Sequence, residues 1–211
     1  MKREPDFQKN SPNVWTKNSN RLEHYSKKYA RQCRKECTQK GEFMIGRKDG
    51  FRRAIVIGCP GSGKTTFSKR LADKIGVPIF HLDAIWHLPD RTHITREKFD
   101  SELAEILSLD SWIIDGNYSR TLEVRMRECD TVFLFDLPTD VCIDGAISRI
   151  GKARCDMPWI DSELDPALEK EIREFRERNL PDIYAMIEKY RDKNAVIFRS
   201  REESEAFLEE V

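Results

Sequence analysis

The apolar residues of positions 52–211 follow two alternating patterns. Short continuous apolar runs predict strands at 52–58, 77–83, 112–115, 131–138 and 195–200. The runs at 112–115 and 131–138 lack the polar positions of a half-exposed strand. Both faces of these strands are therefore expected to be buried, as in a parallel sheet.

Between these runs, apolar residues recur every three or four positions, which is typical of helices with one buried face. Phe67, Leu71 and Ile75 show this spacing after the first run, and Phe99 and Leu103 show it after the second. The alternation of strand and helix predicts an α/β doubly wound domain. Helix starts are expected where capping residues occur: at Thr95, at Thr139, at Asp165 with Pro166, and at Ser200 with Glu203 as a capping box.

The stretch "GCPGSGKTTF" (58–67) follows the first predicted strand and contains the pattern G-x-x-x-x-G-K-[ST]. Its glycines let successive backbone N–H groups turn toward one point, to which the following helix adds its dipole. Phosphate oxygens are expected there, with Lys64 on the β- and γ-phosphates and the Thr65 hydroxyl on Mg²⁺. The predicted nucleotide-binding residues are Gly58, Gly61, Ser62, Gly63, Lys64, Thr65 and Thr66.

Two features that other phosphate-loop proteins use do not occur in the sequence. GTP-binding switches read guanine with an N-K-x-D element, and the sequence contains none. ATP-hydrolysing motors place a glutamate directly after the metal-binding aspartate, but here Asp115 is followed by Gly116 and Asp136 by Leu137. Transfer of phosphate to an organic acceptor is therefore predicted in preference to hydrolysis.

Several motifs resemble those of adenylate kinases. "WIIDGNYSRT" (112–121) resembles their third-strand signature, and "FDLPTDVCIDGAISR" (135–149) is similar to their next strand and helix. A further set of motifs more specifically resembles the adenylate-kinase-related group of DNA topology modulation proteins: "HLDAIWH" (81–87), "CDTVFLFDLP" (129–138) and "RCDM" (154–157).

The resemblance implies a fold and a ligand. The fold is a three-layer P-loop sandwich with a parallel sheet in the strand order 2-3-1-4-5 and a helical lid near 149–176. ATP would lie on the phosphate loop, and the acceptor pocket would lie over residues 83–121. The sequence departs from the group at Gly145, where an arginine often lies over adenine, and at Cys155, where proline is expected.

The resemblance also implies roles for individual charged residues. Asp115 would hold Mg²⁺ through water. Arginines would contact the acceptor, open the lid or neutralise the charge that develops during transfer. The arginines expected in these roles are Arg120, Arg149, Arg173 and Arg176.

Asp83 lies at the end of the second predicted strand, beside the phosphate site. A carboxylate at this point can accept the proton of an attacking hydroxyl, so Asp83 is predicted to be a general base. The alternative is that Asp83 caps the segment that follows it. His81 and His87 flank Asp83 and are expected to be structural.

The sequence leaves the acceptor open between a nucleoside monophosphate and a sugar-like or acid-like hydroxyl compound. A general base at Asp83 favours a hydroxyl group or a ring nitrogen as the attacking group. Three arginines favour an acceptor that carries a phosphate or a carboxylate instead: Arg91, Arg96 and Arg120.

Charge is unevenly distributed along the chain, although 37 basic and 37 acidic residues cancel overall. Basic residues are in excess in 1–50, so these residues are predicted to form a flexible or partly helical extension before a P-loop kinase-like domain at 51–211. A second hypothesis is a nucleotide-responsive regulator whose extension makes weak contact with nucleic acid. No segment has the apolar length of a membrane span, and a cytoplasmic protein is expected.

Overall fold

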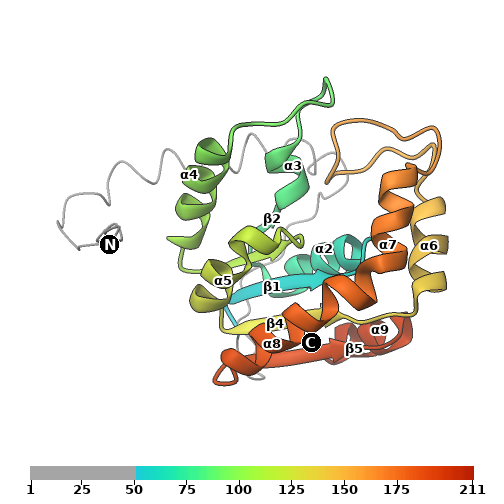
Figure 1. Cartoon of the computed structure of the whole chain (residues 1–211). Coiled ribbons are helices and arrows are strands. Elements are labelled where there is room, and N and C mark those ends of the chain that lie inside the picture. Colours follow the sequence, from blue (N-terminus) through green and yellow to red (C-terminus); the bar gives the residue numbers. More distant parts are fainter. Residues whose placement is uncertain (1–50) are drawn as a thin grey trace, which may run out of the picture. The chain divides into compact units, whose positions relative to one another are not determined.

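A parallel β-sheet lies at the centre of residues 51–211, which are the residues that the computed structural model describes. The order of its strands is β2-β3-β1-β4-β5, and each neighbouring pair is parallel, as the resemblance predicted. The carboxyl ends of the strands therefore lie at one edge of the sheet (Figure 1). The strands are β1 (Arg53–Gly58), β2 (Ile79–His81), β3 (Trp112–Asp115), β4 (Thr131–Phe135) and β5 (Asn194–Phe198).

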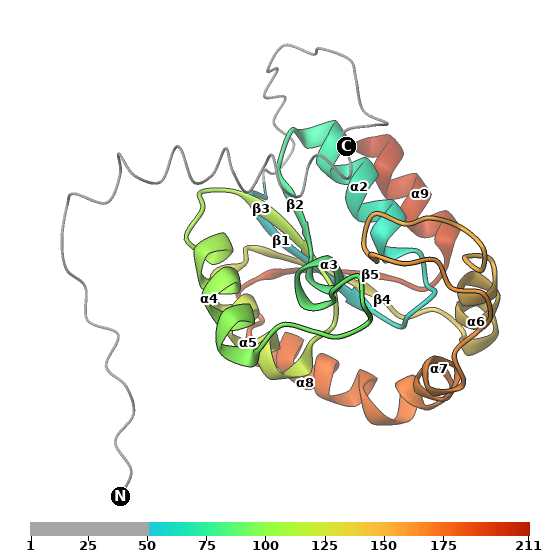
Figure 2. The same ribbon diagram turned by 90° about the horizontal axis from the view of Figure 1, so that it is seen from above.

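Helices cover both faces of the sheet and make the fold a three-layer sandwich. Figure 2 shows α2 and α9 on one face and α4, α5, α7 and α8 on the other. The helices are α2 (Lys64–Ile75), α3 (Leu82–Trp86), α4 (Arg96–Leu107), α5 (Ser119–Glu128), α6 (Thr139–Ile147), α7 (Pro166–Arg178), α8 (Leu180–Lys189) and α9 (Arg201–Glu210).

The core fixes α2 against the sheet through an aromatic cluster. The ring of Phe67 on α2 lies 5.1 Å from the rings of Phe133 and Phe198 and 5.3 Å from that of Phe135, between ring centres. All residues of β3 and β4 are buried, as their unbroken apolar runs predicted. Full burial of one such side chain stabilises the fold by about 1.5–3 kcal/mol. The loop that precedes α2 is therefore held at a defined position above β1.

Three of the predicted helix caps are confirmed. The side chains of Thr95, Asp165 and Ser200 accept hydrogen bonds from backbone N–H groups in the first turns of α4, α7 and α9. The capping box at Ser200 is altered, because the Glu203 carboxylate accepts from the Arg199 N–H. The cap predicted at Thr139 is wrong: Thr139 is already helical, and Pro138 precedes α6 without a side-chain cap.

Two elements differ from the sequence expectation. The second strand ends at His81, and the residues after it form α3, so Asp83 lies in the first turn of a short helix. No side chain caps α3, so the alternative role of Asp83 as its cap is not realised. Helix α5 was not predicted, because its apolar residues Leu122 and Met126 are separated mainly by charged ones.

The predictions for residues 1–50, a basic extension with a possible nucleic-acid contact, lie outside the described residues. Within residues 51–211, no helix combines the length and the apolar character needed to cross a membrane.

Candidate active site

The loop between β1 and α2 bends around an open space at the start of α2. Gly63 precedes the helix with φ 106°, and no side chain caps the helix. A Cβ atom added to Gly63 would meet nothing within 4 Å, so this side of the loop is open. The N–H groups of the first helical turn and the positive end of the helix dipole remain available to an anion. The loop therefore fits the phosphate groups predicted from its sequence.

The other glycines of the loop are needed for close packing. Gly58 and Gly61 have positive φ values, and a Cβ atom at either position would overlap a backbone carbonyl oxygen, of Phe135 or Cys142. Gly145 on α6 packs against Gly61 in the same way. The backbones of α6 and the loop are thus in direct contact, which explains physically why the arginine expected at 145 is absent.

Lys64 is the first residue of α2, and its side chain turns back toward the loop that precedes the helix. Its side chain is 8 % exposed, and its Nζ donates a hydrogen bond to the Cys59 carbonyl oxygen at 2.8 Å. Burial lowers the pKa of Lys64, although the negative charge of Asp115 opposes this effect. Ser62 is fully buried, and its Oγ has no hydrogen-bond partner among residues 51–211, whereas Thr66 is exposed.

Three oxygen atoms converge next to the loop. Thr65 Oγ1 lies 2.8 Å from Asp115 Oδ2, at the end of β3, and 3.2 Å from Asp156 Oδ2, between α6 and α7. A hydroxyl and carboxylates are the hard oxygen ligands that Mg²⁺ prefers. Thr65 and Asp115, the two residues predicted for the metal, thus lie together and fit it. Among residues 51–211, no group of three or more His, Cys, Asp or Glu side chains is placed to hold a metal ion by itself.

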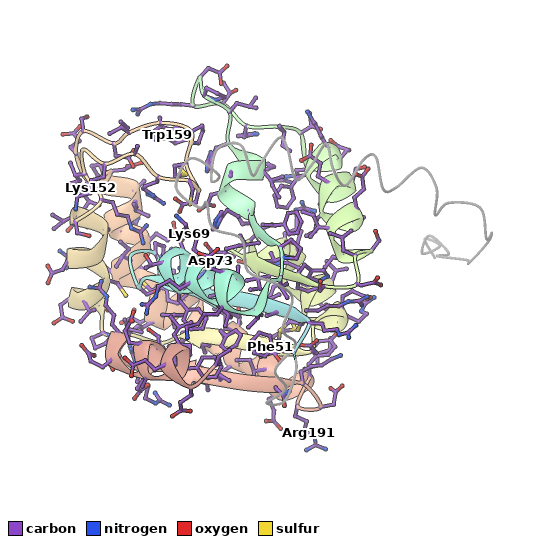
Figure 3. All side chains as sticks on the ribbon, turned by 180° about the vertical axis from the view of Figure 1, so that it is seen from behind. Phe51, Lys69, Asp73, Lys152, Trp159 and Arg191 are labelled. Atoms are coloured by element: carbon purple, nitrogen blue, oxygen red, sulfur yellow. The ribbon has the colours of Figure 1, made fainter. Side chains whose placement is uncertain are left out.

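The loop between α6 and α7 (residues 148–165, the α6–α7 loop) is anchored at this site. Arg154 donates two hydrogen bonds to Asp156, at 3.0 and 2.6 Å. Burial disfavours ionisation of Asp156, but the bonds from Arg154 lower its pKa overall. Figure 3 shows Lys152 and Trp159 of this loop at the end of the domain opposite Phe51, which precedes β1.

His81 joins the α6–α7 loop to β3. Its Nδ1 lies 3.0 Å from Asp115 Oδ2, and its Nε2 lies 3.7 Å from the Cys155 sulfur. Burial opposes a charge on His81, but the hydrogen bonds with Asp115 and Cys155 raise its pKa to about 10. The contact with the His81 ring holds Asp115 in place. This agrees with the structural role expected for His81.

Asp83 faces the same site from α3. Burial raises the pKa of Asp83, and the negative charges of Asp115 and Asp156 raise it further. Tyr118 donates a hydrogen bond to the carboxylate, and this bond lowers the pKa of Asp83. The Tyr118 ring stacks on Phe99 at 5.1 Å between centres, which fixes the direction of its hydroxyl. Asp83 is thus a partly buried, oriented carboxylate near Lys64, as a general base requires.

A buried arginine holds the turn that carries Tyr118. Arg125 on α5 is completely buried, and its guanidinium donates to the carbonyl oxygens of Gly116, Asn117 and Tyr118. Burial lowers its pKa to about 10, so it stays charged at neutral pH. Asn117 in turn accepts a hydrogen bond from the Gly58 N–H at 3.0 Å, which connects this turn to the phosphate loop.

Replacement of Arg125 by leucine is expected to lower the free energy of unfolding by at least about 3 kcal/mol, because several buried carbonyl groups lose their donor. The measurement is urea denaturation of the full chain followed by circular dichroism. Arg127→Leu is the matched control, since Arg127 is exposed on the same helix, and it should change stability by less than about 0.5 kcal/mol. Equal losses in the two variants would contradict the bonding role of Arg125.

The structure brings one of the four predicted arginines to this site. Arg149 is partly buried, and the charges that act on it are those of Arg154, Asp156, Asp115 and Asp83. Its guanidinium makes no hydrogen bond within the described part of the chain, so it is available to an anionic ligand. Burial lowers its pKa, and the neighbouring charge of Arg154 adds to this effect.

The other predicted arginines bind carboxylates elsewhere. Each has a partner: Arg120 donates two bonds to Asp100 at 2.9 and 2.6 Å, Arg173 binds Glu169, and Arg176 binds the buried Asp136 at 2.9 Å. Tyr184 and Arg199 also bind Asp136, so Arg176 belongs to a network at the end of β4. Catalytic roles for these three arginines stay predictions.

Sequence reasoning missed several residues of the site. Asp156 belongs to the quoted motif "RCDM", which indicated its presence but not its contact with Thr65. Tyr118 follows the third predicted strand, but nothing in its local sequence indicates a hydrogen bond to Asp83. Arg125 has no sequence signal either, because a buried arginine and an exposed one look alike in an unpredicted helix.

Comparisons with known proteins find distant likenesses in fold. No protein-family model matches the chain, and no curated protein matches it. The chain is similar to shikimate kinase from Bacteroides thetaiotaomicron, with 20% identity, a TM-score of 0.47 and coverage of 76% of this chain and 96% of that one. It is also similar to a sugar kinase from Janibacter sp. HTCC2649, with 19% identity, a TM-score of 0.48 and coverage of 76% and 92%. No family membership follows from similarities this distant.

Proposed function

We propose that this protein transfers the terminal phosphoryl group of ATP to a hydroxyl group of a small-molecule acceptor, with Mg²⁺ as cofactor. The observation that carries the proposal is the position of Asp83. Its partly buried carboxylate interacts electrostatically with the Lys64 ammonium group and with Asp115, the partner of Thr65. A phosphate-binding loop supplies the donor, and a carboxylate with a raised pKa beside it can take a proton from the acceptor.

Each residue has a distinct role in the proposed reaction. The acceptor oxygen forms a bond to the γ-phosphorus as the bond from this phosphorus to the bridging oxygen breaks, and ADP leaves. Asp83 takes the proton of the acceptor hydroxyl. Lys64 and Arg149 neutralise negative charge on the phosphate groups during transfer. Thr65 and Asp115 would hold Mg²⁺, which when bound would supply further positive charge for this neutralisation.

A hydroxyl compound is favoured over a nucleoside monophosphate as acceptor. Arg120, which the family resemblance assigns to the acceptor, already binds Asp100 through both terminal nitrogens. The guanidinium of Arg91 lies over the ring of Trp159, 5.6 Å from its centre. An anionic acceptor would compete with these contacts. Membership of the adenylate-kinase-related group of DNA topology modulation proteins is part of this proposal, on the motifs named above.

A screen for ATP consumption tests the proposal. The full chain is incubated with ATP, Mg²⁺ and single compounds from a panel of sugars, hydroxy acids, nucleosides and nucleoside monophosphates, with Lys64→Ala protein as the blank. The expected result is ADP formation with at least one hydroxyl compound, accompanied by the phosphorylated product. Consumption with a nucleoside monophosphate alone would overturn the choice of acceptor, and ADP formation equal to the blank throughout would overturn phosphoryl transfer.

A further inference from the structure

At the contact between the phosphate loop and the α6–α7 loop, two carboxylates lie near one hydroxyl group. Asp156 comes 91 positions after Thr65 in the chain, yet its Oδ2 lies 3.2 Å from the Thr65 hydroxyl. Asp156 is only 4 % exposed. Asp115 Oδ2 approaches the same hydroxyl from the end of β3, at 2.8 Å. Two buried carboxylates from separate segments therefore converge on one oxygen atom.

One hydroxyl group cannot satisfy both carboxylates. Thr65 Oγ1 carries a single hydrogen, so it donates to Asp115 or to Asp156 but not to both. The His81 ring contacts Asp115, and Arg154 binds Asp156, so each carboxylate also has a nitrogen partner. The hydroxyl still leaves one of the two carboxylate oxygens beside it without its hydrogen. A divalent cation placed among the three oxygens would accept lone pairs from all of them.

The surroundings of Asp156 direct it toward this point. Arg154 binds both carboxylate oxygens of Asp156 from within the same loop. The Arg154 side chain is 18 % exposed and also lies 4.0 Å from Asp161. A bidentate arginine fixes the orientation of a carboxylate as an outer-shell partner does in metal sites. Asp156 is thus held in a fixed direction rather than left to rotate in solvent.

We propose that Asp156 is a third protein ligand of the cation site formed by Thr65 and Asp115. The cation would then bind between the phosphate loop and the α6–α7 loop, and it would do so before the nucleotide arrives. This inference rests on the proposed function for the identity of the cation, Mg²⁺. It goes beyond that function by making the α6–α7 loop part of the metal site.

The first test is Mn²⁺ binding to the full chain without nucleotide, measured by electron paramagnetic resonance of the free ion. Wild-type protein is expected to bind one Mn²⁺, and Asp156→Asn to bind it at least about 10-fold more weakly, because even outer-shell substitutions cause losses of that size. Glu163→Gln is the matched control, since it removes one exposed negative charge from the same loop. Its affinity should equal that of the wild type.

The second test follows the loop itself by hydrogen exchange with and without Mg²⁺. Mg²⁺ is expected to slow exchange across residues 148–165 in the wild type and in Glu163→Gln, but not in Asp156→Asn. Circular dichroism of all variants checks that they are folded. If Asp156→Asn binds Mn²⁺ as the wild type does, or if the wild type binds none, Asp156 is not a ligand.

The two proposals fail separately. If Mn²⁺ binding is lost in Asp115→Asn but not in Asp156→Asn, only the proposed role of Asp156 is contradicted. The proposal of ATP-dependent phosphoryl transfer is not tested by that outcome. If Mn²⁺ binds without nucleotide in a manner that depends on Asp156, and the acceptor screen is negative, the cation site is supported and the proposed kinase activity is contradicted.

Discussion

Phosphoryl transfer from ATP is expected to fall at least about 10²-fold when Lys64 is replaced by alanine, as happens when a charge contact to the transition state is removed. Lys64 is buried at the start of α2, and its ammonium group donates a hydrogen bond to the Cys59 carbonyl oxygen in the phosphate loop. It therefore lies where donor phosphates would bind, and no other lysine side chain among residues 51–211 is buried. The measurement is the kcat for ADP formation with the acceptor found in the screen.

Lys74→Ala is the matched control for this variant. Lys74 lies on the last turn of the same helix and is exposed, so its removal should leave kcat unchanged. Thermal unfolding of both variants separates loss of function from loss of fold. Transfer by Lys64→Ala at the wild-type rate would show that the loop does not hold the reacting phosphates.

The second large effect is expected at Asp83. Asp83→Asn keeps the size of the side chain but removes the group that takes the acceptor proton, so kcat/KM should fall by about 10²–10⁴-fold. Asp110→Asn makes the same change at an exposed position and should have no effect. The two variants are compared with the same acceptor at saturating ATP. A loss of less than about threefold in Asp83→Asn would be too small for a general base.

The pH profile distinguishes a base from a residue that only binds. A base acts in its ionised form, so kcat/KM should rise as pH increases through the pKa of Asp83, which burial and the charges of Asp115 and Asp156 hold above its ordinary value. The hydrogen bond from Tyr118 lowers this pKa. Tyr118→Phe should therefore move the rise to higher pH, with activity retained above it. An unmoved profile would exclude Asp83 as the group that titrates.

Much of the architecture followed from local patterns in the sequence. The unbroken apolar runs of β3 and β4 predicted strands buried on both faces, and those strands are buried along their length. Thr95, Asp165 and Ser200 marked true helix starts because a cap needs only a side chain and the N–H groups two or three residues further on. Thr139 failed because Pro138 lies directly before it and the helix begins one residue early.

The candidate site was predictable only in part. The phosphate-loop motif indicated Thr65 for the metal, and the family resemblance implied Asp115. The two lie together in the structure because one follows β1 and the other ends β3, and these strands are neighbours in the sheet. Arg120 was expected to contact the acceptor or the transferring phosphoryl group, a role that stays a prediction, and in the structure it binds Asp100 of α4. A family motif gives the position of such a residue in the chain, whereas its partner depends on a helix from a different part of the sequence.

By itself, the sequence determined the phosphate loop, the alternation of strands and helices, and the glycines that the loop needs. These features depend on the backbone conformation of adjacent residues, which local sequence controls. Only the tertiary structure decided that Asp156 meets Thr65, that Tyr118 meets Asp83, and that Arg125 is buried. Each of these contacts joins distant segments, and their positions are set by the packing of the whole domain and not by the spacing of residues along the chain.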